Sequence, residues 1–279
     1  MTRACVIGWP VTHSRSPLIH GYWLKKYGIE GAYEKVPVKP DEVVGFLRSL
    51  RDHGFAGCNV TLPYKETAYA VATRKEAAAR AVGAANTLWY EGDDLVADNT
   101  DAEGFMNHLR ASATRLFLRN SAVSILGAGG AARAIAYSFL QAGVEEVRVF
   151  NRTRDRADQL VHHFGSRVKP FDWNERASRS RDVSVLVNAT TLGMNGAEWL
   201  DMDVSTLRKD CVVADIVYVP LETPLLMAAR ARGLTAVDGL GMLMHQAVPG
   251  FERWFGVRPE VTDELRTLLV ADIEGASPC

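Results

Sequence analysis

The stretch Ser124-Ile-Leu-Gly127-Ala-Gly129-Gly130-Ala-Ala132 joins a short apolar strand to a helical pattern. In such a sequence Gly127 permits a tight turn, Gly129 lets the backbone approach a pyrophosphate, and Ala132 allows close packing of helix and strand. A helix that begins near Gly130 directs its N–H groups and its positive end toward a diphosphate. The alternative is a glycine-rich turn without a ligand. A second apolar strand at residues 147–150 supplies the context that dinucleotide binding requires.

The residues after that second strand indicate which dinucleotide binds. Sites that prefer NAD place Asp or Glu there to hold the ribose hydroxyls, whereas this chain has Asn151-Arg152-Thr153-Arg154-Asp155-Arg156. Guanidinium groups pair with phosphate through two parallel hydrogen bonds, so this segment suits a ribose 2′-phosphate. Asp155 is expected in the first turn of the next helix, where acidic residues are common. An exposed basic helix start is the alternative, but the pattern favours NADP.

Outward from this unit, short apolar strands alternate with helical stretches. The predicted strands are residues 4–8, 33–38, 58–61, 123–126, 147–150, 183–188 and 212–217. The predicted helices are residues 16–27, 41–53, 74–81, 101–110, 130–142, 154–164, 224–232, 240–255 and 259–273. This alternation predicts an α/β fold with parallel sheets covered on both faces. Residues 86–90 and 95–99 flank Glu91-Gly-Asp-Asp94 and predict a β-hairpin at the edge of an otherwise parallel sheet.

The length of 279 residues suggests two domains, at about 150 residues each. We expect a three-layer α/β domain for substrate binding and catalysis over residues 1–101, completed by residues 239–279. Residues 102–238 are expected to form a doubly wound, Rossmann-type domain that binds NADP. Lys and Arg number 32 against 33 for Asp and Glu, so the chain lacks the basic excess of a nucleic-acid binder.

The sequence also indicates the cellular compartment of the protein. No segment has the ~18 uncharged apolar residues of a membrane helix, and the N-terminus lacks the pattern of a secretory signal. Four widely spaced cysteines form no C-x-x-C pair, which is typical of reduced thiols and not of a zinc site. We therefore expect a soluble cytoplasmic protein without a metal, and the choice between monomer and homodimer stays open.

Polar clusters in the first domain lie where predicted strands end, which is where ligands bind in open α/β sheets. In His13-Ser14-Arg15-Ser16-Pro17, two hydroxyl groups stand two residues apart just before a helix. Ser16 alone would serve as a helix N-cap, with Pro17 at the first helical position. Capping leaves Ser14 without a role, so we predict that both serines bind a carboxylate.

A second cluster, Asn59-Val-Thr61-Leu-Pro63-Tyr64-Lys65, puts Asn59 and Thr61 on one face of a strand and Lys65 at the mouth of the sheet. Asn86 opens the predicted hairpin, and Asn99-Thr-Asp101 follows it. An amine and a carboxylate brought together by the fold make a proton-transfer pair, which is our prediction for Lys65 and Asp101. A weak surface salt bridge is the alternative.

Eight motifs then occur in an order and spacing that resemble the shikimate dehydrogenase family, which includes shikimate/quinate enzymes, over essentially the whole chain. They are His13-Ser-Arg-Ser-Pro17, Asn59-Val-Thr-Leu-Pro-Tyr-Lys65, Gly83-Ala-Ala-Asn86-Thr87, Asn99-Thr-Asp101-Ala-Glu-Gly104, Gly127-Ala-Gly-Gly-Ala131, Asn151-Arg-Thr153, Asn188-Ala-Thr-Thr-Leu-Gly-Met194 and Asp238-Gly-Leu-Gly-Met-Leu-Met-His-Gln246.

The resemblance implies reversible, NADPH-dependent reduction of 3-dehydroshikimate to shikimate in the chorismate route to aromatic amino acids. It implies that Lys65 and Asp101 are catalytic and that the C-terminal helices return to the first domain. The implied substrate-binding residues are Ser14, Ser16, Asn59, Thr61, Lys65, Asn86, Asp101, Tyr218 and Gln246. The implied cofactor-binding residues are Gly127, Ala128, Gly129, Gly130, Ala131, Asn151, Arg152, Thr153, Arg156, Thr190 and Gly239.

Three other functions remain as alternatives. A quinate/shikimate dehydrogenase that also uses NAD would fit the same hydroxylated-acid pocket, although the arginines after Asn151 count against NAD. An aminoshikimate-type enzyme would use the same residues. A non-catalytic NADP-binding sensor would be expected to lose Lys65 or Asp101, and both are present.

Overall fold

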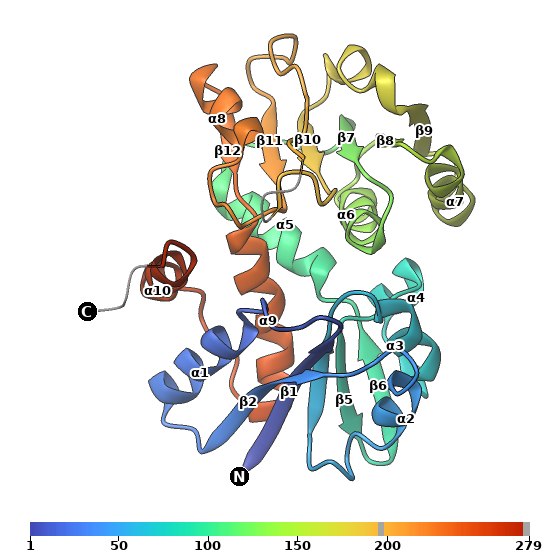
Figure 1. The fold of residues 1–279 in the computed structure, drawn as a ribbon. Helices are drawn as coiled ribbons and strands as arrows, with labels where there is room; N and C mark the ends of the chain where they lie inside the picture. Colours follow the sequence, from blue (N-terminus) through green and yellow to red (C-terminus); the bar gives the residue numbers. More distant parts are fainter. Residues whose placement is uncertain (195–197, 276–279) are drawn as a thin grey trace. The chain divides into compact units, whose positions relative to one another are not determined.

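The computed structural model describes residues 1–194 and 198–275, so Cys279 lies outside the described part. The chain divides into two compact units (Figure 1). Unit 1 comprises Met1–Gly104 and Leu243–Cys279, and unit 2 comprises Phe105–Met242. The chain passes from unit 1 to unit 2 within helix α5 (Asp101–Ser112) and returns within helix α9 (Leu240–Phe255).

Unit 1 contains a six-stranded sheet in the order β2-β1-β3-β5-β6-β4. Its strands are β1 (Thr2–Gly8), β2 (Gly31–Pro37), β3 (Gly57–Val60), β4 (Arg74–Lys75), β5 (Thr87–Glu91) and β6 (Asp94–Asp98). The predicted hairpin is β5–β6, but the expectation that it forms the edge of the sheet is wrong. The two-residue strand β4 pairs in parallel with β6 and is the edge. Strand β5 runs antiparallel to both of its neighbours.

Helices cover both faces of this sheet, as its side-chain alternation requires. They are α1 (Ser16–Tyr27), α2 (Val43–Arg48), α3 (Lys65–Val71), α4 (Ala77–Val82), α10 (Asp263–Ile273) and the C-terminal part of α9. On β1, Cys5 and Ile7 belong to a core shared with α2 and α3. Val6 faces the other way, into a cluster with Trp254 of α9. The predicted three layers and the return of the C-terminal helices are confirmed.

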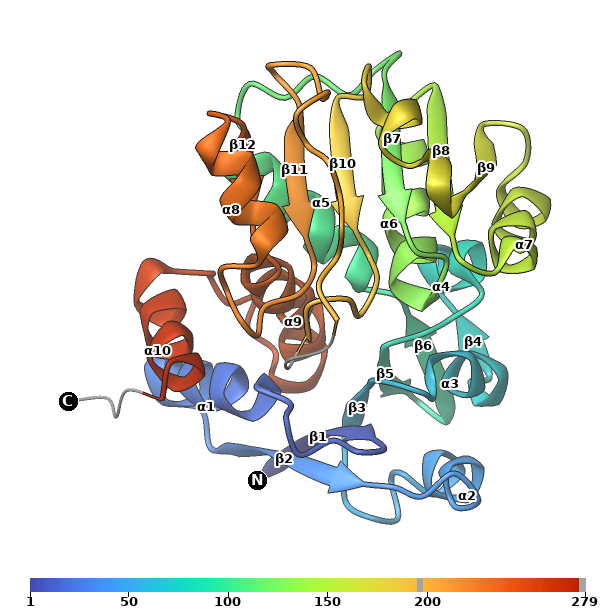
Figure 2. The same cartoon turned by 45° about the horizontal axis from the view of Figure 1, so that its top comes forward.

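Unit 2 is a fully parallel sheet in the order β12-β11-β10-β7-β8-β9, covered by helices (Figure 2). Its strands are β7 (Ala122–Leu126), β8 (Glu146–Asn151), β9 (Val168–Asp172), β10 (Val185–Asn188), β11 (Val212–Asp215) and β12 (Thr235–Val237). Its helices are α6 (Gly130–Gln141), α7 (Arg154–Phe164), α8 (Pro224–Ala231) and the short 3-10 helices η1 (Trp173–Glu175) and η2 (Ser178–Ser180).

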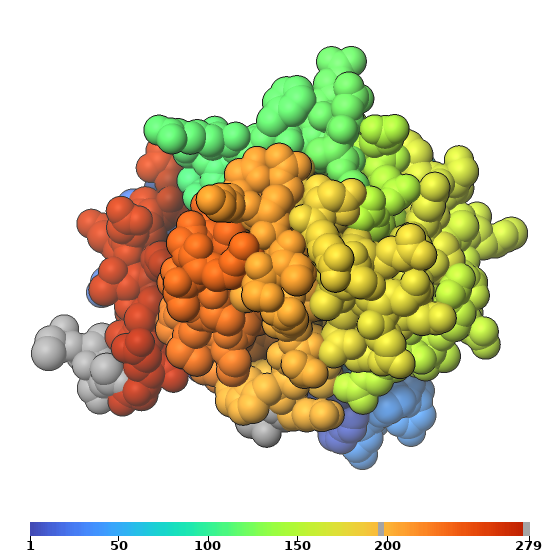
Figure 3. Space-filling view, turned by 90° about the horizontal axis from the view of Figure 1, so that it is seen from above, coloured from blue at the N-terminus to red at the C-terminus, as the bar shows by residue number. Residues whose placement is uncertain are grey.

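The strand order of unit 2 reverses between β7 and β10, and this reversal is where doubly wound sheets bind nucleotides. The predicted Rossmann-type fold is confirmed. Figure 3 shows one face of unit 2 in space-filling form, with the green connection between α5 and β7 at its upper margin. No helix within the described ranges is long and apolar enough to cross a membrane.

Several short elements differ from the prediction for identifiable reasons. Residues 65–71 form α3, and the helix expected from residue 74 starts at Ala77 because β4 precedes it. Strand β9 contains Pro170, which lacks an N–H group and is tolerated at a sheet edge, and β9 is the edge strand of unit 2. Strand β9 contains a proline and strand β12 has only three residues, so neither strand has a pattern that an analysis of periodicity detects.

Candidate active site

Lys65 and Asp101 form a close ion pair in unit 1. Lys65 is the first residue of α3 and Asp101 is the first residue of α5. The Lys65 Nζ atom lies 2.5 Å from Asp101 Oδ2. The two side chains are only 19% and 7% exposed, so the pair is not the surface salt bridge of the alternative. The structure thus brings together an amine and a carboxylate in a largely desolvated place.

Asn86 links the other oxygen of this carboxylate to Gln246. Asn86 Nδ2 donates to Asp101 Oδ1 at 2.9 Å and to Gln246 Oε1 at 3.0 Å. The Asn86 side-chain oxygen accepts the backbone N–H of Thr100 at 2.8 Å. A Cβ atom on Gly104 would lie 2.6 Å from Gln246 Cβ, so only glycine allows α5 and α9 to approach here. Four predicted site residues therefore form one cluster.

The two serines also lie together, at the start of α1. The Ser14 and Ser16 hydroxyl oxygens are 3.2 Å apart, and the Ser16 N–H donates to Ser14 Oγ at 3.3 Å. Arg15 occupies the N-cap position, and no side chain caps the helix. The capping alternative for Ser16 is therefore wrong. Adjacent hydroxyls beside a helix N-terminus suit an anion, as expected for a carboxylate site.

Asn59 is buried, and its side-chain amide binds groups of the protein. Its Nδ2 atom donates to the Asn86 carbonyl oxygen and to Thr87 Oγ1, both at 3.1 Å. Its Oδ1 atom accepts the Tyr33 hydroxyl at 2.6 Å. Thr61 is half-buried just after β3. The sequence analysis assigned no site role to Tyr33, which lies in a predicted strand, or to Thr87, which was named only as the end of a family motif.

The glycine-rich turn of unit 2 has the shape that a diphosphate requires. Gly127 has a φ angle of +106°, which favours glycine, and a Cβ there would lie 3.0 Å from the Ala189 carbonyl oxygen. A Cβ on Gly129 or Gly130 would meet nothing within 4 Å, so the backbone is open to a ligand. Helix α6 begins at Gly130 without a side-chain cap. These residues fit the phosphates of a dinucleotide.

The three arginines of the basic turn after β8 differ in their ion-pair partners. Arg154 is held by Asp158 and Asp172. Arg152 is 63% exposed and has only a 3.9 Å contact with a carboxylate, Glu198 Oε2. Arg156 pairs with no carboxylate of the described ranges. Asp155 lies in the first turn of α7, as predicted, and Ala128 and Ala131 flank the glycines without a polar group.

Thr153 and Asn151 complete this turn. Thr153 is the N-cap of α7, but its hydroxyl makes no capping hydrogen bond. Asn151 Nδ2 donates to the Thr153 carbonyl oxygen at 2.8 Å and so shapes the turn. The exposed surface here therefore offers two guanidinium groups and one hydroxyl, which is the set expected for a 2′-phosphate.

Thr190 belongs to a polar network that ends at a buried carboxylate. Its hydroxyl donates to Asn188 Oδ1 at 2.7 Å, and Asn188 Nδ2 donates to Asp215 Oδ1 at 2.9 Å. Burial raises the pKa of Asp215 to about 6. Asp215 was not predicted from the sequence, although its position at the end of an apolar strand is a signal.

The last two predicted residues lie near the end of β11. Tyr218 follows this strand. Gly239 lies against Ile216, because a Cβ added to Gly239 would be 2.2 Å from the Ile216 carbonyl oxygen.

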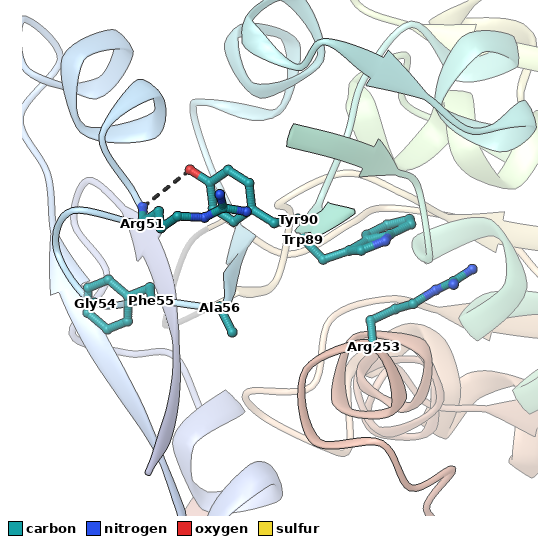
Figure 4. A pocket seen from close by; sticks show the side chains of 7 residues that line it. All are labelled: Arg51, Gly54, Phe55, Ala56, Trp89, Tyr90 and Arg253. Atoms are coloured by element: carbon teal, nitrogen blue, oxygen red, sulfur yellow. Dashed lines mark hydrogen bonds between the residues drawn. The ribbon is translucent and has the colours of Figure 1, made fainter. Parts of the chain in front are cut away.

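A separate cavity of about 420 Å³ lies beside the beginning of β3 and the end of β5 (Figure 4). It is lined by Arg51, Gly54, Phe55, Ala56, Trp89, Tyr90 and Arg253. Arg51 stacks on the Tyr90 ring and Arg253 on the Trp89 ring. Both guanidinium groups also have carboxylate neighbours, Asp93 and Glu91. None of the predicted site residues lines this cavity.

Family models match most of the chain. The shikimate dehydrogenase substrate binding domain matches residues 6–88, the shikimate / quinate 5-dehydrogenase model residues 111–220, and the shikimate 5'-dehydrogenase C-terminal domain residues 239–264. Shikimate dehydrogenase (NADP(+)) of Azorhizobium caulinodans is 52% identical over 98% of this chain and 97% of its own. The chain belongs to the shikimate dehydrogenase family. The resemblance seen in the motifs is confirmed.

Solved shikimate dehydrogenases share the whole fold. The shikimate 5-dehydrogenase of Thermus thermophilus, in complex with NADP(H) and shikimate, has a TM-score of 0.85 and 35% identity over 99% of this chain and 100% of its own. A quinate dehydrogenase of Corynebacterium glutamicum in complex with NAD has a TM-score of 0.88 and 29% identity, over 97% and 99%. The family thus contains members of both substrate types.

Proposed function

We propose that this chain catalyses the reversible reduction of 3-dehydroshikimate to shikimate by NADPH, a step of the chorismate route to aromatic amino acids. The observation that carries the proposal is the buried Lys65–Asp101 pair with Asn86 and Gln246 around it. This cluster lies in the unit whose N-terminal part matches the family's substrate-binding domain. The relatives named as NADP-dependent shikimate dehydrogenases support the same reaction.

NADP is the cofactor, and unit 2 has the groups to hold it. Gly127 forms the tight turn, and Gly129 and Gly130 leave the backbone open to its diphosphate. Arg152, Thr153 and Arg156 are assigned to the 2′-phosphate, and Asn151 to the shape of their turn. The adjoining cofactor contacts are assigned to Ala128, Ala131, Thr190 and Gly239. When bound, the reduced cofactor supplies the hydride that the substrate carbonyl carbon receives.

We assign the substrate contacts by the chemistry of each side chain. Ser14 and Ser16 bind the carboxylate with their adjacent hydroxyls. Thr61, Asn86 and Gln246 bind and orient the ring hydroxyls, and Tyr218 is assigned to the substrate by the family resemblance. Each is an uncharged hydrogen-bonding group, which suits a small polyhydroxylated acid.

Lys65 and Asp101 handle the proton. As the carbonyl oxygen gains negative charge, the Lys65 ammonium stabilises that charge and donates a proton from Nζ. In the oxidative direction Nζ accepts the hydroxyl proton. Asp101 holds Nζ through Oδ2, while Asn86 holds Asp101 through Oδ1. The amine therefore keeps one position during the reaction.

A paired rate assay tests the proposal. Purified protein is given shikimate or quinate, each with NADP⁺ or NAD⁺, and formation of reduced nicotinamide is followed. We expect fast turnover only with shikimate and NADP⁺. Comparable rates with quinate or NAD⁺ would favour a quinate dehydrogenase function. This function is the second candidate because the similar Corynebacterium structure is a quinate dehydrogenase in complex with NAD. Binding of NADP⁺ without any turnover would contradict both.

Two further expectations stay predictions from the sequence. The cytoplasm is inferred from the absence of paired cysteine motifs, and the lack of a nucleic-acid partner is inferred from the balanced charge. The lack of a membrane partner is inferred from the absence of a long apolar segment, and the choice between monomer and homodimer stays open. Fractionation of cells and the mass of the protein in solution measure the two directly.

A further inference from the structure

A chain of buried hydrogen bonds leads from strand β2 to the carboxylate of the ion pair. The Tyr33 hydroxyl donates to Asn59 Oδ1 at 2.6 Å, and Asn59 Nδ2 donates to Thr87 Oγ1 at 3.1 Å. Thr87 Oγ1 donates to Asn86 Oδ1 at 3.2 Å, and Asn86 Nδ2 donates to Asp101 Oδ1 at 2.9 Å. All five residues are buried. We refer to them as the Tyr33–Asp101 chain.

The fold builds this chain by placing Tyr33 and Asn59 on the two strands that flank β1, and Thr87 on the strand next to Asn59. Tyr33 lies on β2, Asn59 lies on β3, and Thr87 on β5 is directly opposite Asn59 in the antiparallel register. Residues directly opposite on adjacent strands are close enough to hydrogen-bond. The chain therefore crosses the sheet from β2 to the residues that follow β6.

The donors and acceptors of the chain set its direction. The Thr100 hydroxyl has one proton, and its shorter bond, at 2.8 Å, goes to the carbonyl oxygen of Gln246. The Thr87 hydroxyl lies 3.1 Å from Thr100 Oγ1 and 3.2 Å from Asn86 Oδ1, so its proton is shared between these two acceptors. The Thr100 N–H donates to the Asn86 side-chain oxygen at 2.8 Å. A reversed Asn86 amide would set its NH₂ group against these donors, so its NH₂ group faces Asp101.

Tyr33 is fixed at the far end of the chain. Its ring stacks on His20 with centroids 3.9 Å apart and planes at 10°. Burial raises the pKa of Tyr33, so the hydroxyl keeps its proton and acts as a donor, and an interaction with the Ser16 hydroxyl opposes part of this rise. Tyr33 is thus held by the His20 ring and donates to the chain that reaches Asp101.

We propose that Tyr33 is a positioning residue: through the chain, its hydroxyl orients the Asp101 carboxylate that holds Lys65. The proposal rests on the proposed function and deepens it. It also gives Asn59 a role that needs no substrate contact, because both amide protons and the amide oxygen bind protein groups. A row of aligned donors stabilises the charged carboxylate at its end.

The test compares Tyr33→Phe with the control Tyr64→Phe. Tyr64 is another buried tyrosine of unit 1, and its hydroxyl donates to the Val38 carbonyl oxygen at 2.7 Å, outside the chain. With shikimate and NADP⁺ we expect kcat of Tyr33→Phe to fall about 10-fold, with KM for shikimate changed less than about threefold. Tyr64→Phe should keep kcat within about twofold, although both variants lose one buried hydrogen bond.

A second pair of variants tests the middle of the chain. Thr87→Val removes the hydroxyl and should lower kcat about 10-fold, whereas Thr87→Ser keeps the hydroxyl and should retain the wild-type kcat. The double variant Tyr33→Phe/Thr87→Val should match Thr87→Val within about twofold, because both changes break one chain.

Three results would overturn the proposal: an unchanged kcat in folded Tyr33→Phe, an equal loss in Tyr64→Phe, or losses that multiply in the double variant. If Tyr33→Phe does not fold, the Thr87 pair decides. Absence of turnover in the wild-type protein would instead overturn the proposed function, so the two failures are distinct.

Discussion

Lys65 and Asp101 each begin a helix, and this position affects the two charges in opposite ways. The positive end of a helix dipole stabilises a carboxylate and disfavours an ammonium. The Asp101 carboxylate therefore does more than hold Lys65 in place, because it also offsets the unfavourable field at the start of α3. An ion pair with only 19% and 7% exposed side chains is sensitive to loss of either partner.

Replacing Ser14 by Ala should weaken substrate binding and leave the rate of the chemical step nearly unchanged. The change removes a hydroxyl that we assign to the substrate carboxylate, so KM for shikimate should rise about 10-fold or more while kcat stays within about twofold. Steady-state kinetics measure both constants. The control is Ser49→Ala, since that exposed hydroxyl bonds only to the Gly45 carbonyl oxygen of its own helix turn. A lower kcat at unchanged KM would refute the assignment.

Single residues differ in how much of their role the sequence predicts. Ser14, Lys65 and Asp101 follow predicted strands, and this placement can be inferred from pattern alone. The helices after Ser14 and at Asp101 were predicted as well, whereas α3, which begins at Lys65, was not. The partners of Asn59 cannot, because Tyr33 is 26 residues away and becomes its neighbour only through the strand order. Hydrogen bonds across a sheet depend on which strands pair, and periodicity does not set that.

At the scale of elements, the β8–α7 turn owes its cofactor preference to the acidic residues around it. Asp158, one helix turn along α7, and Asp172 at the end of β9 both bind Arg154. Arg152 and Arg156 are thereby left for the proposed 2′-phosphate site. Arg154 is distinguished from the other two arginines by Asp158 at i+4 on α7 and by Asp172, which the pairing of β8 with β9 brings close.

Arg156→Gln should weaken NADP⁺ specifically. It removes a guanidinium from the proposed 2′-phosphate site, so KM for NADP⁺ should rise about 10-fold, while the rate with NAD⁺ stays unchanged. Arg154→Gln is the matched control, because that guanidinium is already held by carboxylates. Equal effects of the two substitutions on KM for NADP⁺ would contradict the proposal that Arg156 binds the 2′-phosphate and Arg154 does not.

The end of β11 carries a carboxylate that titrates unusually. Asp215 accepts hydrogen bonds from Asn188, Val217 and Thr223, yet burial raises its pKa to about 6 from 3.8. The folded state therefore binds more protons than the unfolded state between these pH values. The stability that this group provides is complete below pH 3.8 and is lost as pH rises to about 6, by about 3 kcal/mol in total.

Asp215→Asn should abolish this dependence on pH. An amide cannot ionise, and its oxygen still accepts the Asn188 and Val217 bonds. We expect the free energy of unfolding of the variant, relative to wild type, to increase by about 3 kcal/mol from pH 4 to pH 7. Denaturant unfolding of both proteins at several pH values measures this difference. Parallel curves for the two proteins would show that Asp215 titrates normally.

At the scale of the whole molecule, the chain distributes its chemistry between two units. The proposed proton-transfer residues belong to unit 1, and the proposed NADP residues belong to unit 2. The two helices in which the chain changes unit also carry site residues, Asp101 at the start of α5 and Gln246 within α9. Gly104 allows these two helices to meet in unit 1.

The doubly wound fold of unit 2 could be predicted because the glycine turn and the alternating strands occur in an uninterrupted series. The sheet of unit 1 was harder to predict. Strand β4 has two residues, too few for a periodic pattern, so its pairing beyond the hairpin was missed. Short strands are specified by their neighbours in space and not by their own sequence.

The central claim is that Lys65 moves the proton in an NADP-dependent oxidation of shikimate. The most direct test compares kcat and KM of wild type and Lys65→Ala with shikimate and NADP⁺, after NADP⁺ binding has shown that both proteins are folded. We predict that kcat falls on the order of 10²- to 10⁴-fold with only a modest change in KM for shikimate. A variant that turns over at nearly the wild-type rate would contradict the account.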